Sequence, residues 1–148
     1  MLLPVLQTFF LRDLNRLRQE IELYKSEPTI WQIDKDIKNS AGNLTLHLVG
    51  NLNTYIGAEL GKTGYVRHRE LEFSLKDVSR SELLTKIDDT ARMIQHVLDT
   101  LSEASLQEEY PVLVFEQKTS TQYLLVHLST HLAYHLGQVN YHRRLLDV

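Results

Sequence analysis

Three of the seven histidines stand four residues apart near the end of the chain, in a stretch that otherwise favours a helix. They are His127, His131 and His135. On an α-helix, four residues turn about 40° around the axis and advance about 6 Å along it, so two neighbouring members can offer imidazole nitrogens to one small cation. The first and last members are about 12 Å apart, too far to share an ion whose bonds to nitrogen are about 2 Å long. The spacing therefore predicts a metal site that uses one pair and leaves the third histidine another role.

Polar residues continue along the same face of this predicted helix. His131, His135, Gln138 and His142 share a narrow sector, where an ordinary packed helix would carry leucine and valine. A buried imidazole without a partner costs on the order of 1 to 3 kcal/mol, so metal, hydrogen bonds or water must satisfy this stripe. No carboxylate lies on the stripe, and the sequence indicates no obvious general base.

A useful catalytic metal site needs a third ligand, and His47 is the predicted one. It is the only distant histidine on the apolar face of a predicted helix, whereas His68 lies in a charged segment and His96 beside a glutamine, as is typical of surface positions. Asn51, one turn from His47, is expected to orient a ligand or a substrate, as is Gln138. Three imidazoles with an open fourth position are typical of catalytic zinc, although nickel, iron, manganese or copper accept the same ligands. On its own, so short a motif more often marks surface or core histidines than a metal.

Composition limits the other possibilities. The 148 residues are 43% hydrophobic and 24% charged with a net charge of -3, which fits one domain over residues 1–148 and argues against nucleic-acid binding. Without cysteine, a metal must be held by imidazole, carboxylate or water. The apolar start of the chain lacks a basic leader and a cleavage site, so neither a signal peptide nor a membrane span is expected, and a cytoplasmic location fits.

Hydrophobic periodicity predicts four long helices. They cover Leu3 to about Lys25, Leu44 to about Gly61 after the cap-type residues 39–43, Ser79 to about Ser102, and Ser120 to about Leu146. Three connections join them. In the first connection, 31–38, Trp31 and Ile33 are expected to cover one end of the core. The second, 62–78, is expected to be a long crossover whose charges are solvated. The third, 108–116, is expected to be either an extended edge or a tucked loop. The predicted fold is all-α, a four-helix bundle with a long crossover connection, in which sites form between facing helices.

Taken together, the two histidine segments carry a family resemblance. A helical His47 within Asn39–Leu52, followed far downstream by His131-x-x-x-His135-Leu-Gly-Gln138, resembles the DinB/YfiT-like superfamily of metal-binding four-helix bundles over essentially the whole chain. The resemblance implies that His47, His131 and His135 are the metal ligands and that His127 is a neighbour one turn away. It also implies a homodimer, and activity as a metal-dependent transferase that attaches low-molecular-weight thiols to electrophiles, although some relatives are hydrolase-like or isomerases.

The leading hypothesis is an enzyme that binds a divalent metal, zinc or nickel before iron or manganese, and transfers a small-molecule thiol to an electrophile. A free thiol has a pKa near 8.5, whereas a thiol coordinated to a cation is deprotonated. One alternative is a metal-dependent hydrolase of a small molecule, which needs a base that the sequence does not reveal. Another is a non-catalytic bundle of a stress response, in which the metal only secures packing or dimerisation. Neither nucleic acid nor a membrane is an expected partner.

Overall fold

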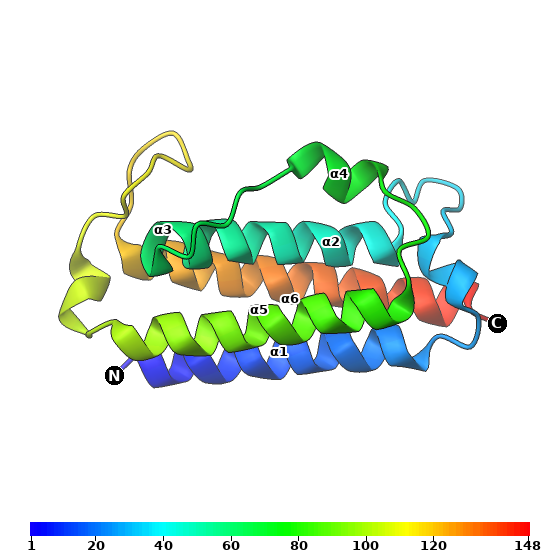
Figure 1. Ribbon diagram of the computed structural model, residues 1–148, viewed down its shortest axis with the longest axis horizontal. Helices are drawn as coiled ribbons and strands as arrows, with labels where there is room; N and C mark the ends of the chain where they lie inside the picture. The colour runs from blue at the N-terminus through cyan, green and yellow to red at the C-terminus, as the bar shows by residue number, and fades with distance from the viewer.

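The computed structural model describes residues 1–148, and its fold is an all-helical bundle, as predicted. Four long helical segments lie side by side, and a short helix crosses above them (Figure 1). The long segments are α1 (Leu3–Leu23), α2 (Ala41–Leu52), α5 (Arg80–Thr100) and α6 (Thr121–Leu146). The shorter ones are η1 (Glu27–Trp31), η2 (Asn53–Ala58), α3 (Glu59–Gly61), α4 (Arg69–Ser74) and η3 (Ala104–Gln107). No helix is both long enough and apolar enough to cross a membrane.

Three of the long helices begin at a serine that caps the first turn. The side chains of Ser40, Ser79 and Ser120 each accept a hydrogen bond from the backbone N–H three residues on, at the start of α2, α5 and α6. Ser40 thus starts the second helix three residues earlier than the predicted Leu44, which adds almost a turn before His47. At the other end, α2 continues through the π-helical η2 into α3, so the predicted span to Gly61 is a helix with a local change of period.

One apolar core joins the four long segments. It contains 27 buried residues, among them Phe10 and Leu17 of α1, Leu48 of α2, Ile94 of α5 and Leu128 of α6. Burying each such side chain contributes about 1.5 to 3 kcal/mol. His47 is buried beside this core, whereas His131 and His135 are half-buried at its edge.

The connections differ from expectation in two places. Trp31 is buried as predicted, but Ile33 is 55% exposed and does not cover the core. The 62–78 connection is not wholly solvated, because it returns along the length of the bundle and carries α4, which packs on α2 (Figure 1). The third connection is tucked in only at its base: buried Tyr110 donates a hydrogen bond from its hydroxyl to the carbonyl of Tyr55 at 2.6 Å, whereas Leu113 is 60% exposed.

Candidate metal centre

The α6 half of the site is a pair of imidazoles on consecutive turns. His131 and His135 are both half-buried, and their ring centres lie 4.5 Å apart at right angles. The two Nε2 atoms approach to 3.1 Å. This spacing follows directly from the i, i+4 geometry of a helix, on which such side chains share one face.

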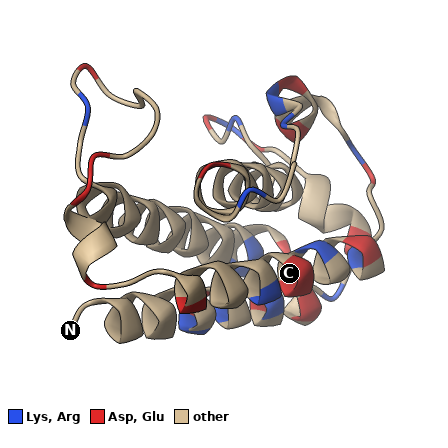
Figure 2. Ribbon diagram, turned by 60° about the vertical axis from the view of Figure 1, so that its left-hand side comes forward, with Lys and Arg blue, Asp and Glu red and all other residues tan.

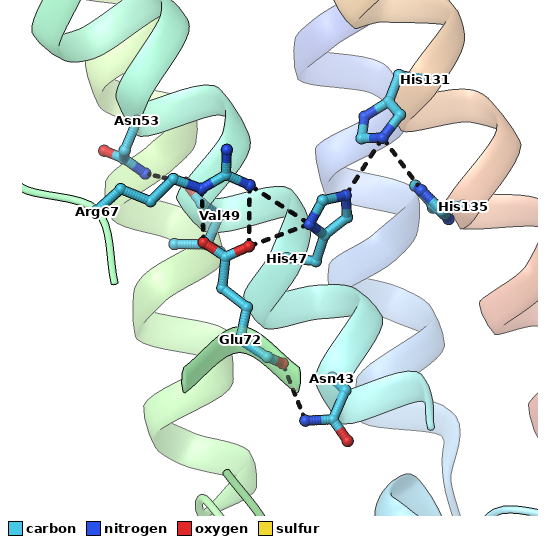
Figure 3. A network of polar contacts seen from close by, with 8 residues as sticks. All are labelled: Asn43, His47, Val49, Asn53, Arg67, Glu72, His131 and His135. Atoms are coloured by element: carbon cyan, nitrogen blue, oxygen red, sulfur yellow. Dashed lines mark hydrogen bonds and ion pairs between the residues drawn. The ribbon is translucent and has the colours of Figure 1, made fainter. Parts of the chain in front are cut away.

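The third imidazole comes from α2, which packs against α6. His47 is 7% exposed, and its Nε2 lies 3.3 Å from Nε2 of His131 (Figure 3). One nitrogen from each of the three rings lies within 4.8 Å of the others. Residues separated by 84 positions in sequence are thus brought together by helix packing.

A buried carboxylate fixes the far side of the His47 ring. Nδ1 of His47 lies 3.0 Å from Oε1 of Glu72, which is 6% exposed. The guanidinium of Arg67 holds the same carboxylate through two hydrogen bonds, Nε to Oε2 at 2.8 Å and Nη2 to Oε1 at 2.9 Å. An ionised carboxylate only accepts hydrogen bonds, so Nδ1 of His47 carries the proton and Nε2 presents its lone pair to the cluster.

The position of Glu72 depends on two residues of α2. The side-chain amide of Asn43 donates to the carbonyls of Glu72 and Leu75, at 2.9 and 2.8 Å, and ties α4 to the start of α2. Gly50 makes room for the carboxylate, because a Cβ atom at this position would stand 1.9 Å from Oε2 of Glu72. The α2 surface therefore has both an anchor and a recess for the α4 glutamate.

The second nitrogens of the α6 pair are held differently. Nδ1 of His135 lies 2.7 Å from the side-chain oxygen of exposed Gln138, to which it donates. Nδ1 of His131 is buried and has no hydrogen-bond partner. Two of the three rings are therefore fixed in the tautomer that leaves Nε2 free to bind a cation.

Burial favours the unprotonated form of His47 and His131. Burial first, and then the neighbouring histidines, together lower the pKa of His131 to about 4. Burial also lowers the pKa of His47, against the opposing effect of Glu72. Neutral imidazole is the form that binds metal, so the site is ready for a cation at neutral pH.

The donor set fits a divalent cation. Bonds of about 2.0 to 2.1 Å to a tetrahedral zinc place two ligand nitrogens roughly 3.3 Å apart. The two shorter separations in the cluster are 3.3 and 3.1 Å. Without a cation, a single proton on Nε2 of His131 would have to serve both neighbouring lone pairs. The arrangement thus suits a metal better than a hydrogen-bonded histidine cluster.

Comparison with known protein families identifies the family to which the chain belongs. A family described as "Protein of unknown function (DUF1572)" matches residues 10–147. The chain belongs to this DUF1572 family. No match was found among curated proteins. The match includes all three clustered histidines together with Arg67 and Glu72, so the whole arrangement lies within the DUF1572 region.

The other residues singled out in this DUF1572 sequence have different surroundings. His127 stacks on His131 with ring centres 6.2 Å apart and also meets the edge of Phe115 at 4.8 Å. Asn51 is buried, but its side-chain oxygen has no hydrogen-bond partner, so it does not orient His47. Exposed His68 and His96 stay outside the cluster, as expected.

His142 shares the sequence stripe but not the site. It is buried, with Nδ1 2.6 Å from the hydroxyl of Tyr24 and Nε2 2.7 Å from the carbonyl of Gln32. It lies seven residues beyond His135, which is about 10 Å along the helix. Its role is to join α6 to α1 and to the first connection.

Sequence reasoning missed Arg67 and Glu72. Their connection was expected to be solvated, yet it supplies the only carboxylate that touches the cluster. The available signal was weak: Glu72 is flanked by Leu71 and Phe73, a short apolar context for a charge. Nothing in the sequence states that this segment turns back over α2.

Proposed function

We propose that this DUF1572 protein is a metal-dependent enzyme that transfers a low-molecular-weight thiol to an electrophilic small molecule. His47, His131 and His135 would hold one divalent cation, with zinc or nickel favoured over iron or manganese. The observation that carries the proposal is the convergence of three Nε2 atoms from two helices, two of them with a fixed tautomer. The resemblance of both histidine segments to the DinB/YfiT-like superfamily supports the same ligands and the same reaction class.

The residues around the cluster have different expected roles in the reaction. A bound divalent cation would supply Lewis acidity, lowering the pKa of a thiol or a water molecule that it coordinates. Glu72 accepts the hydrogen bond from Nδ1 of His47, and Arg67 holds the Glu72 carboxylate in place through two hydrogen bonds. His131 and His135 are only half-buried, which leaves a side of the cluster accessible to small molecules. The net reaction forms one sulfur–carbon bond, breaks the bond from that carbon to its leaving group, and releases the thiol proton to solvent.

The environment of Glu72 favours thiol transfer over hydrolysis. Hydrolysis needs a general base within reach of a water molecule. Glu72 is the one carboxylate at the cluster, and both of its oxygens are occupied by Arg67 and His47. A thiol that is acidified on binding needs less assistance from a base. The hydrolase therefore remains the second candidate reaction.

A non-catalytic bundle is the competing class. In that case the metal would secure helix packing, and its binding energy would be folding energy. The half-buried position of His131 and His135, which leaves the cluster open to solvent, supports a site that can also receive a substrate. Dimerisation is proposed from the resemblance, and exposed Val5 and Phe9 of α1 together with Val126 of α6 offer apolar surface for it. Light scattering would give the mass of the particle.

The testing experiment is elemental analysis of protein purified without an affinity tag or chelator. Wild type is compared with alanine variants of His47, His131 and His135, and with His96→Ala as an exposed control. Near-stoichiometric metal in wild type and His96→Ala, but not in the other variants, supports the site.

Thermal melting then separates the enzyme from the non-catalytic bundle: a small change in Tm on metal removal supports the enzyme, and a large fall supports a structural role. Thiol and electrophile screening follows with the metal-loaded protein. A wild type that neither contains nor takes up zinc, nickel, manganese or iron overturns the proposal.

A further inference from the structure

A groove runs along α6 from the histidine cluster toward the end of the helix. Its volume is about 560 Å³, within the range of small-molecule sites. On the α6 side its wall extends from Tyr134 and His135 to Leu145, a distance of about 16 Å. Because His135 and Gln138 are part of this wall, the groove opens directly beside the candidate metal centre.

The opposite wall of the groove is formed by other segments. It consists of the start of α2 at Leu44 and the connection at 36–39. Buried His142 ties that connection to α6, since its Nε2 donates to the carbonyl of Gln32 at 2.7 Å, and Tyr24 holds the other ring nitrogen. These bonds restrict the start of the connection that leads into this wall, which lowers the entropic cost of binding.

The lining indicates what the groove accepts. No Asp, Glu, Lys or Arg occurs between Thr121 and His142, and Figure 2 shows charged residues mainly on other segments. Tyr134, Tyr141 and Leu145 are each more than 60% exposed and offer aromatic and apolar surface. The only full charges on the lining are Asp36 and Lys38, both exposed on the connection and opposite in sign. The two charges on the lining therefore cancel, and the nearest charge on α6 is the guanidinium of Arg144, 5.2 Å from the ring centre of Tyr141.

We infer that this groove binds the electrophile, and that the electrophile is an uncharged, elongated molecule with an aromatic body. Its length matches the groove, its body lies on Tyr134 and Tyr141, and its reactive carbon lies at the His135 end. Aromatic contacts stabilise a complex beyond the effect of the area that they bury. This inference rests on the proposed function for the identity of the ligand as a substrate, but the groove and its preference are properties of the chain alone.

Binding of an unreactive probe tests the groove without turnover. N-phenyl-1-naphthylamine is uncharged, aromatic and elongated, and its fluorescence rises in apolar surroundings. We expect one molecule to bind per chain. The Tyr134→Ala/Tyr141→Ala double variant is expected to weaken binding at least fivefold, as is Leu145→Trp, which fills the groove from an exposed position. Tyr123→Ala is the matched control, because Tyr123 is a similarly exposed tyrosine of α6 outside the groove lining.

The result is distinguishable from failure of the proposed function. Binding that persists in His131→Ala, with no thiol transfer by any metal-loaded protein, supports the groove and overturns the reaction. With 4-(chloromethyl)biphenyl, an uncharged and elongated electrophile, chloride leaves as the sulfur–carbon bond forms, and Leu145→Trp should raise KM at least fivefold with little change in kcat. Turnover with an unchanged KM in Leu145→Trp overturns the groove assignment and leaves the reaction standing. The groove is equally overturned if the probe binds wild type and the groove variants alike, or is lost to the same extent in Tyr123→Ala.

Discussion

The two walls of the candidate centre are built in different ways. On α6, His131 and His135 come from one continuous helix, and their relative position follows from a four-residue spacing. On the other wall, His47 depends on a carboxylate from α4 and on a guanidinium from the connection before it. One wall is local and neutral, with Gln138 as its exposed partner; the other is assembled from three segments and contains a buried ion pair. The spacing of the ligands His131 and His135 therefore comes from local sequence, whereas the orientation of His47 comes from contacts between distant segments.

The largest effect is expected from His131→Ala, which removes the nitrogen that both walls approach. The Nε2 atoms of His47 and His135 lie 3.3 and 3.1 Å from it. We expect zinc affinity, measured by competition with a chromogenic chelator, to fall by more than 100-fold, since changes outside the ligand set already cost 10- to 100-fold. His127→Ala is the control, because His127 stacks on His131 without joining the cluster. Near-normal affinity in His131→Ala would show that the cluster is not the metal site.

Glu72→Gln tests the wall assembled from three segments. The amide keeps the shape of the side chain but removes the charge that fixes the His47 tautomer, so zinc affinity should fall about 10- to 100-fold. The variant also leaves Arg67 without its counter-charge in a largely buried position, where its side chain is 15% exposed, so it should lower the free energy of unfolding.

Adding Arg67→Met to Glu72→Gln separates the two effects. The double variant should regain stability in urea unfolding but not zinc affinity. Recovery of both together would mean that Glu72 acts only through stability and does not position His47.

Gly50→Ala alters the same wall without touching a polar group. The new methyl would occupy the space of the Glu72 carboxylate, which must tilt away from His47. Zinc affinity should fall severalfold, less than in Glu72→Gln, because part of the hydrogen bonding can re-form. Gly137→Ala on α6 is the matched control: no atom lies within 4 Å of its added Cβ, so it should keep affinity and stabilise the helix by up to about 1 kcal/mol. Isothermal titration with zinc and thermal melting of both variants check this pair. Equal zinc affinities in Gly50→Ala and Gly137→Ala would show that the recess at Gly50 does not position Glu72.

The contrast between the walls also explains what the sequence could predict. Local signals predicted the long helices and singled out His47 on an apolar face, whereas the choice of His131 and His135 as its partners came from the family resemblance. Periodicity identifies which face of a helix is buried, and two buried faces that carry histidine must meet in a bundle.

Other features depended on the path of the chain, which periodicity does not encode. Glu72 reaches His47 because Asn43 anchors α4 and Gly50 leaves a recess, and these are contacts between segments. His142 lies on the predicted stripe but pairs with Tyr24, since seven residues carry it beyond the reach of the cluster. Ile33 was expected in the core, yet the connection presents it to solvent.

The smallest effect is expected from Gln138→Leu on the local wall. Its side-chain oxygen accepts from Nδ1 of His135, as Glu72 does from His47, but Gln138 is exposed and uncharged. Water can take its place as acceptor, and water-mediated hydrogen bonds cost little compared with direct ones. Zinc affinity should therefore fall no more than about threefold, against at least tenfold for Glu72→Gln, in the same chelator competition. If the two losses were equal, orientation of the local wall would depend on its partner as strongly as that of the assembled one. Helix geometry alone would then not be enough to hold His135 in place.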